Sequence, residues 1–234
     1  MAARSSGGRP SGTKPVQART RLARAAVIDA ARTLFLERGY GATTIEAISE
    51  LAGVPPATVY RLFSSKHGIL KALMDVTIAG DDERAPVADR SPVRTLLATP
   101  DAHAQLAGFV QFVAQINERA APIYRILVSA AGTDPDATAL LDELTRQRQQ
   151  GQRLIARSLA QAGALRPELR ERDAADIIHA LLSPEMYRLL VVDRGWKIER
   201  YVKWLTQLLV DQLLAPAPDV AVNPRRRPRA PRSQ

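Results

Sequence analysis

Cysteine is absent from the sequence and histidine is scarce, and these two gaps exclude several kinds of site. Without a thiol there is no disulfide, no thiol nucleophile and no cysteine-ligated zinc or iron–sulfur site. The histidines, His67, His103 and His179, lack metal-ligand spacing, and the sequence has neither a nucleophile elbow nor a phosphate-binding glycine loop. We therefore expect no metal, no cofactor and no catalytic residue, with a helical enzyme as the alternative.

Long apolar stretches are missing as well. No uncharged apolar run approaches the roughly 18 residues of a membrane-spanning helix. The basic N-terminus is not followed by the apolar segment of a secretory signal, and the absence of cysteine fits a reducing compartment. We expect a cytoplasmic protein that does not insert into a membrane. A helical scaffold, or a protein that uses its basic ends at a membrane surface, is a second alternative.

Positive charge is concentrated at the two ends of the 234-residue chain, whose formal net charge is +9. Residues 1–24 hold six Arg or Lys and no acid, and residues 215–234 hold five Arg and one Asp. Two basic ends on a nearly neutral body suggest a polyanionic partner, either nucleic acid or an anionic membrane surface. Both ends are rich in proline and small polar residues, so we expect a disordered basic arm at 1–19 and a disordered basic tail at 215–234.

Between these ends the sequence predicts an all-α protein. Ala, Leu, Arg, Glu and Gln dominate, and the alternating apolar runs typical of strands are absent. The helices predicted first run from Arg21 to a cap at Gly39, from a capping box at Thr43–Glu46 to Leu51, from Pro56 to Phe63, and from Lys66 to about Gly80. Later helices are predicted at Ala102–Arg119, Pro122–Ala131, Pro135–Ala162, Arg172–Arg194 and Lys197–Leu214. Residues 81–100 predict a loose connection, and Pro184 either kinks its helix or starts a new one.

Residues 45–64 have the spacing of a helix-turn-helix. Two short helices that cross steeply need a small residue where they touch, supplied by Ser49, and a glycine able to adopt positive φ, supplied by Gly53. The apolar residues expected to face the core are Ile48, Leu51, Val54, Val59 and Leu62. On spacing alone, a corner between two helices of any helical bundle is the alternative.

The flanking sequence, AAVIDAARTLFLERGYGATTIEAISELAGVPPATVYRLFSSKHGIL, resembles the N-terminal domain of the tetracycline-repressor (TetR) family of bacterial regulators. The resemblance includes the helix before the motif, the Gly-Tyr turn, the Thr-Thr cap, Ala-Gly-Val, Tyr-x-x-Phe and the Lys that opens the next helix. The chain departs from the family pattern at three positions: Pro55 replaces the usual Ser cap, Ala57 the usual Gly and Leu62 the usual aromatic. The resemblance implies a ligand-responsive repressor that binds a palindromic operator as a homodimer and is released by a small apolar effector.

The expected DNA-binding residues are Thr44, Pro56, Ala57, Thr58, Tyr60, Arg61 and Lys66. The N-terminal half of the second motif helix enters the major groove, so its side chains reach base edges. There Pro56 and Ala57 offer apolar contact to thymine methyl groups, and Arg61 offers a bidentate pair to guanine or a phosphate contact. The resemblance implies that Thr58, Tyr60, Thr44 and Lys66 are phosphate ligands, the last two at helix N-termini that also attract anions.

The second half of the chain resembles the family's variable regulatory half, in which the last two helices of each subunit form a dimer bundle. The last predicted helix has an apolar stripe at 3–4 spacing: Ile198, Tyr201, Val202, Leu205, Leu208, Leu209 and Leu213. Trp204 falls outside it and is expected at the edge of the dimer or packed within one subunit. The resemblance also implies an effector pocket. Its expected lining is Met74, Phe109, Phe112, Tyr124 and Leu127, with Gln115 or His103 as polar anchor.

Together these observations predict four segments. They are a basic arm at 1–19, a helix-turn-helix DNA-binding domain at 20–66, a regulatory and dimerisation domain at 67–214, and a basic tail at 215–234. The expected partners are double-stranded DNA, a second copy of the chain and a small-molecule effector, without a membrane.

Overall fold

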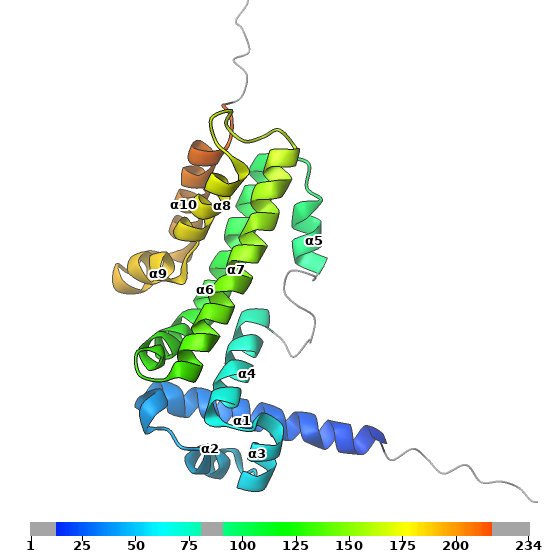
Figure 1. The fold of residues 1–234 in the computed structure, drawn as a ribbon, viewed down its shortest axis with the longest axis vertical. Coiled ribbons are helices and arrows are strands. Elements are labelled where there is room, and N and C mark those ends of the chain that lie inside the picture. Colours follow the sequence, from blue (N-terminus) through cyan, green and yellow to red (C-terminus); the bar gives the residue numbers. More distant parts are fainter. Residues whose placement is uncertain (1–12, 81–90, 217–234) are drawn as a thin grey trace, which may run out of the picture.

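The computed structural model describes residues 13–80 and 91–216, and it is helical almost throughout (Figure 1). The helices that follow one another from the N-terminus are α1 (Thr13–Ala42), α2 (Ile45–Ala52), α3 (Pro56–Phe63), α4 (Lys66–Ala79) and α5 (Ser91–Leu97). They are followed by α6 (Ala102–Ala131), α7 (Pro135–Gln161), α8 (Glu171–Leu181), α9 (Pro184–Tyr187), the π-helical turn η2 (Arg188–Asp193) and α10 (Ile198–Leu213). Within the described ranges there is no strand, so the predicted all-α class is confirmed.

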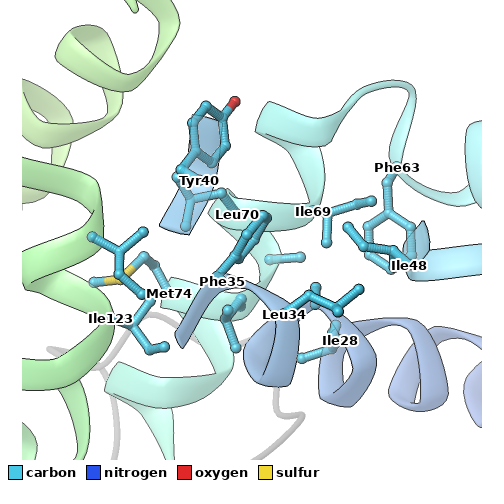
Figure 2. Packing of buried hydrophobic residues seen from close by; sticks show 14 of the residues in the cluster. Ile28, Leu34, Phe35, Tyr40, Ile48, Phe63, Ile69, Leu70, Met74 and Ile123 are labelled. Carbon is cyan, nitrogen blue, oxygen red and sulfur yellow. The ribbon is translucent and has the colours of Figure 1, made fainter. Parts of the chain in front are cut away.

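The first four helices pack around one hydrophobic cluster at one end of the molecule (Figures 1 and 2). Phe35 of α1 and Ile48 of α2 are almost fully buried, and Ile69 and Leu70 of α4 meet them from the other side. The same cluster continues into α6 through Ile123 and into the first half of α7. Burial of this apolar surface therefore joins the motif helices to the long helices behind them.

The predicted arm at 1–19 is corrected at its C-terminal end. Helix α1 begins at Thr13, so residues 13–19 are helical rather than disordered. Residues 1–12 and 217–234, which carry the rest of the arm and almost all of the tail, lie outside the described residues. At its other end, α1 leaves helical geometry at Gly39, where φ is 77°.

Helices α6 and α7 pack against each other along the molecule (Figure 1). The predicted helix break at Pro122 is wrong, because α6 runs unbroken from Ala102 to Ala131. Proline costs an interior helix one hydrogen bond, but the neighbouring Ala120, Ile123 and Leu127 are buried and hold the helix together by packing. Arg119 of α6 also donates to the carbonyl oxygens of Thr77 and Ile78, both at 3.3 Å, and so fixes the end of α4.

Helices α8 to α10 cover the other half of the long pair around a second hydrophobic cluster. Pro184 starts a new helix: Ser183 caps α9 by accepting from the backbone N–H of Met186 at 3.1 Å, which decides between the two possibilities left by the sequence. The apolar stripe of α10 faces inward, since Tyr201, Leu205, Leu209 and Leu213 are fully buried within the chain. Trp204 packs edge-on against Trp196, with ring centroids 5.6 Å apart.

None of the described helices is long and apolar enough to cross a membrane. The segment 81–100, predicted as a loose connection, contains a short helix, α5. Gln105 of α6 holds this helix by donating to the carbonyl oxygens of Leu96 at 3.0 Å and Leu97 at 3.3 Å.

Candidate nucleic-acid interface

The turn between α2 and α3 is held by Gly53 and Ser49. Gly53 has φ of 62° and ψ of 28°, the left-handed region that L-residues with a side chain rarely adopt. Its N–H donates to the Glu50 carbonyl at 3.2 Å, and the Val54 N–H donates to the Ser49 carbonyl at 3.1 Å. The buried Ser49 hydroxyl donates in turn to the Val54 carbonyl. Ser49 is therefore a hydrogen-bonding residue of the turn as well as a small contact residue.

The start of α2 differs from the predicted capping box. Thr44 alone is the N-cap, accepting from the Ala47 N–H at 3.1 Å, and Glu46 is not placed to complete a reciprocal pair. Thr43 is instead 1% exposed, and its hydroxyl donates to the carbonyl oxygens of Gly39 at 2.8 Å and Leu34 at 3.2 Å. It therefore closes the end of α1, where carbonyl groups lack helical partners. The expectation for Leu51 is wrong, because its side chain is 54% exposed.

Helix α3 has one buried face and one exposed face. Val59 and Phe63 face the first cluster, and Leu62 is half-buried against it. Of the predicted contact residues on this helix, Thr58 is half-buried and four are exposed: Pro56, Ala57, Tyr60 and Arg61. Tyr60 is 46% exposed, so it is not a core residue of this chain. The exposed face thus brings together an apolar corner, a phenol and a guanidinium.

Close packing of α4 on α3 depends on Gly68. A Cβ atom at this position would lie 1.9 Å from the Phe63 carbonyl oxygen, so only glycine allows the approach. Arg24 of α1 contacts the same corner, with its guanidinium 4.9 Å from the centroid of the Phe63 ring. Neither residue was identified from the sequence, because contacts between different helices do not follow from the local spacing of residue types.

Lys66 is held inside this framework. Its Nζ donates to the carbonyl oxygens of Tyr40 at 2.8 Å and Thr43 at 2.9 Å, and it lies 4.3 Å from the centroid of the Tyr40 ring. Two of the three ammonium hydrogens are thus used within the chain. Burial and the Asp134 carboxylate raise the pKa of Tyr40 to about 12, so its phenol stays neutral.

The charge of the motif is balanced, because residues 25–66 contain four Arg or Lys and four Asp or Glu. The first half of α1, by contrast, carries basic residues. Arg19 and Arg21 are exposed there, and Lys14 lies in the first turn of the same helix.

Comparison with known proteins agrees with this geometry. The family described as "Bacterial regulatory proteins, tetR family" matches residues 27–73. The HTH-type transcriptional regulator YdeS of Bacillus subtilis (strain 168) is 32% identical over 169 residues, which cover 71% of this chain and 77% of YdeS. This chain belongs to the TetR family. It is a helix-turn-helix transcriptional regulator and not an enzyme.

Solved structures of other proteins share the fold. NalD, described as the secondary repressor of the MexAB-OprM multidrug efflux pump in Pseudomonas aeruginosa, aligns with a TM-score of 0.66 at 22% identity, over 83% of this chain and 98% of NalD. A complex of SmeT with triclosan aligns with a TM-score of 0.63 at 20% identity, over 90% of this chain and 99% of SmeT. At these identities the likeness concerns the fold.

The residues predicted to line an effector pocket do not converge in this TetR-family chain. Met74 and Leu127 are buried in the first cluster, with Tyr124 half-buried against it. Phe109 is buried in the second cluster, and Phe112 is half-buried against that cluster. The polar anchors Gln115 and His103 are both exposed. The sequence did not reveal that the apolar residues among them are divided between two separate clusters.

Proposed function

We propose that this regulator is a homodimeric repressor that binds a two-fold-symmetric DNA operator and is released by a small, mostly apolar effector. The observation that carries the DNA-binding part is the exposed N-terminal face of α3, with Pro56, Ala57 and Arg61 outside and Val59 and Phe63 buried behind them. A helix seated in this way presents its first turns to the major groove. The description of NalD as a repressor and the triclosan complex of SmeT support the repressor and effector parts.

Within this proposal the contacts have separate roles. Arg61 reads a guanine, and Pro56 and Ala57 contact thymine methyl groups. Thr44, Thr58 and Tyr60 contact phosphates, which carry no sequence information. Lys66, whose ammonium already donates to two carbonyl oxygens, contributes by fixing the start of α4 and adds one remaining hydrogen for a phosphate.

The division of labour along the chain is part of the same proposal. Residues 20–66, preceded by the basic segment at 1–19, bind DNA, and residues 67–214 bind the effector and the second subunit. On α8 and α10, several apolar side chains remain partly exposed after the chain has folded: Ile177, Leu181, Val202 and Leu208. In a two-fold-symmetric dimer these side chains of both subunits would be buried in one interface, and this burial would stabilise the dimer.

Selection from a random duplex library with the purified full-length protein tests the proposal. The expected result is an enriched palindrome whose half-sites are separated by roughly 34 Å, about one helical turn, or by more. Recovery of duplexes without a shared motif would overturn it.

A further inference from the structure

A polar layer separates the two hydrophobic clusters along α6 and α7. On α7, the residues up to Leu144 belong to the first cluster and those from Ile155 onward to the second. Between them lie Arg148 and Gln152, one helical turn apart on the same face. Gln152 is only 2% exposed, and Asn117 of α6 is 4% exposed in the corresponding gap. Buried polar groups thus gather at one level of an otherwise apolar interior.

His179 of α8 connects the two residues of α7. Nη2 of Arg148 lies 3.3 Å from Nε2 of His179, and Nδ1 of His179 lies 2.6 Å from Oε1 of Gln152. A guanidinium only donates, so Nε2 is the acceptor and Nδ1 carries the hydrogen that Oε1 accepts. Burial and the Arg148 charge lower the pKa of His179, which agrees with a neutral ring.

This arrangement leaves two donors unused. Nε of Arg148 and Nε2 of Gln152 are buried and have no hydrogen-bond partner among the described residues. Native interiors rarely leave buried donors unpaired, so such a pair requires an explanation. The unused donors lie on one helix face and are both N–H groups, and the complementary group is therefore an acceptor oxygen.

Two small residues, Gly151 of α7 and Ala120 of α6, lie at the level of the polar layer. Gly151 follows Arg148 by three residues and is its neighbour on the helix surface. A Cβ atom added at Gly151 would meet no heavy atom within 4 Å. Ala120 of α6 is buried and belongs to neither hydrophobic cluster.

The charges already present favour an uncharged ligand. Nη1 of Arg148 lies 3.9 Å from Oε2 of Glu185, and the Tyr124 hydroxyl donates to Oε1 of the same carboxylate at 3.0 Å. The guanidinium charge is therefore balanced within the chain. A carboxylate ligand would add a second anion near Glu185, and the two negative charges would repel each other.

We propose that the polar layer of Arg148, Gln152 and His179 binds the carbonyl oxygen of a small, uncharged and otherwise apolar molecule. The apolar parts of that molecule lie against the hydrophobic clusters on either side of the layer. This inference rests on the proposed function, since it gives the effector a site and a chemical class.

The test compares three probes with a common aromatic ring: acetophenone, its hydrocarbon counterpart ethylbenzene, and benzoate. Dissociation constants are measured by saturation-transfer NMR with the full-length protein. Acetophenone is expected to bind roughly tenfold more tightly than either of the others, because only its oxygen meets the unused donors without adding charge. Equal binding of acetophenone and ethylbenzene, tighter binding of benzoate, or no binding of any probe would overturn the proposal.

Two variants and a matched control locate the site. Gln152→Leu is expected to lower the affinity for acetophenone to that for ethylbenzene, whereas Gln150→Leu, at an exposed position of the same helix, leaves both unchanged. Because Gln152→Leu also removes the acceptor of His179, Gly151→Leu provides a second variant that keeps the hydrogen bonds and fills the space. It is expected to abolish binding of acetophenone and ethylbenzene. A folded Gly151→Leu protein that still binds acetophenone like the wild type would refute the site.

Binding of the same protein to the selected operator distinguishes a failure of the proposed function from a failure of this inference alone. A wild-type protein without sequence-specific DNA binding contradicts the proposed function, whatever the probes do. A protein that binds its operator but shows no preference for acetophenone contradicts only this inference.

Discussion

The side chain of Thr43 closes the C-terminal end of α1 by donating to two carbonyl oxygens, those of Leu34 and Gly39. Ser49 acts in a similar way in the turn between α2 and α3, where its hydroxyl donates to the Val54 carbonyl. Both hydroxyls are buried. Each replaces the hydrogen bond that a backbone carbonyl would otherwise make to water.

Thr43→Val keeps the shape of the side chain but removes its donor. We expect it to lower the free energy of unfolding by about 1–3 kcal/mol, because the buried carbonyl oxygens lose a partner. Thr33→Val is the control, since the Thr33 hydroxyl donates to the backbone carbonyl of Asp29 on the exposed side of α1. Urea unfolding of both variants checks the prediction. Equal losses would show that the Thr43 hydrogen bonds do not stabilise this corner.

His179 makes the stability depend on pH. Burial and Arg148 lower its pKa below the ordinary value of 6.5, while Asp176 and Glu185 act in the opposite direction. The unfolded chain therefore takes up the proton first, so the contribution is present above about pH 6.5 and is lost as the pH falls through the lowered pKa. Urea unfolding between about pH 7 and about pH 5 is expected to show a smaller loss for His179→Gln than for the wild type. Identical pH profiles would contradict a neutral His179.

At the scale of helices, much of the motif was predictable because its constraints are local. Gly53, the Pro at the start of α3 and the apolar spacing indicated α2 and α3 in nearly their observed bounds. The errors lie where tertiary packing decides. Leu51 fits the core-facing spacing but remains exposed at the surface, and Pro122 stays helical because α6 is packed along its length.

The candidate site was predicted less completely than the fold. The residues on the exposed face of α3 were identified from the docking geometry of a helix-turn-helix and from the resemblance to the TetR family. The role of Lys66 was not, because it depends on carbonyl groups 26 and 23 residues away in the sequence. The unused donors of Arg148 and Gln152 likewise become visible only when α7 and α8 are placed together.

Lys66 links the start of α4 to the α1–α2 corner, and its removal tests that link. We expect Lys66→Met to lower the free energy of unfolding by roughly 1–3 kcal/mol, because charge-assisted hydrogen bonds to two carbonyl oxygens are lost. Lys71→Met is the control: Lys71 pairs with Glu143 at 2.7 Å, but both side chains are more than a third exposed, so the expected loss is about 0–1 kcal/mol. If the Lys66 variant were as stable as the Lys71 variant, the hydrogen bonds of Lys66 would not stabilise the fold. Only its proposed contact with DNA would then remain.

At the scale of the whole molecule, the proposed dimer is tested at residues that the folded chain leaves partly exposed. Charged substitutions at Leu205 and Leu209, the obvious choice from the sequence, would disrupt the core because both are fully buried within one chain. Leu181→Glu combined with Leu208→Glu instead alters the partly exposed apolar surface of α8 and α10. We expect this variant to sediment as a monomer at micromolar concentration and to lose operator binding.

Leu154→Glu is the matched control for the dimer, since Leu154 is 36% exposed on α7. It is expected to sediment like the wild type. A monomeric wild type would exclude the proposed dimer, and a monomeric Leu154→Glu variant would move the interface to α7.

Sequence-specific binding through α3 is tested by equilibrium binding of the wild type and of Arg61→Ala to the selected operator and to a scrambled duplex. Measurements at several salt concentrations separate base contacts from phosphate contacts. Arg61→Ala is predicted to lose roughly 1–3 kcal/mol on the operator and much less on the scrambled duplex, whereas Tyr60→Phe weakens both alike. A wild-type protein that binds operator and scrambled DNA equally at every salt concentration would contradict the claim.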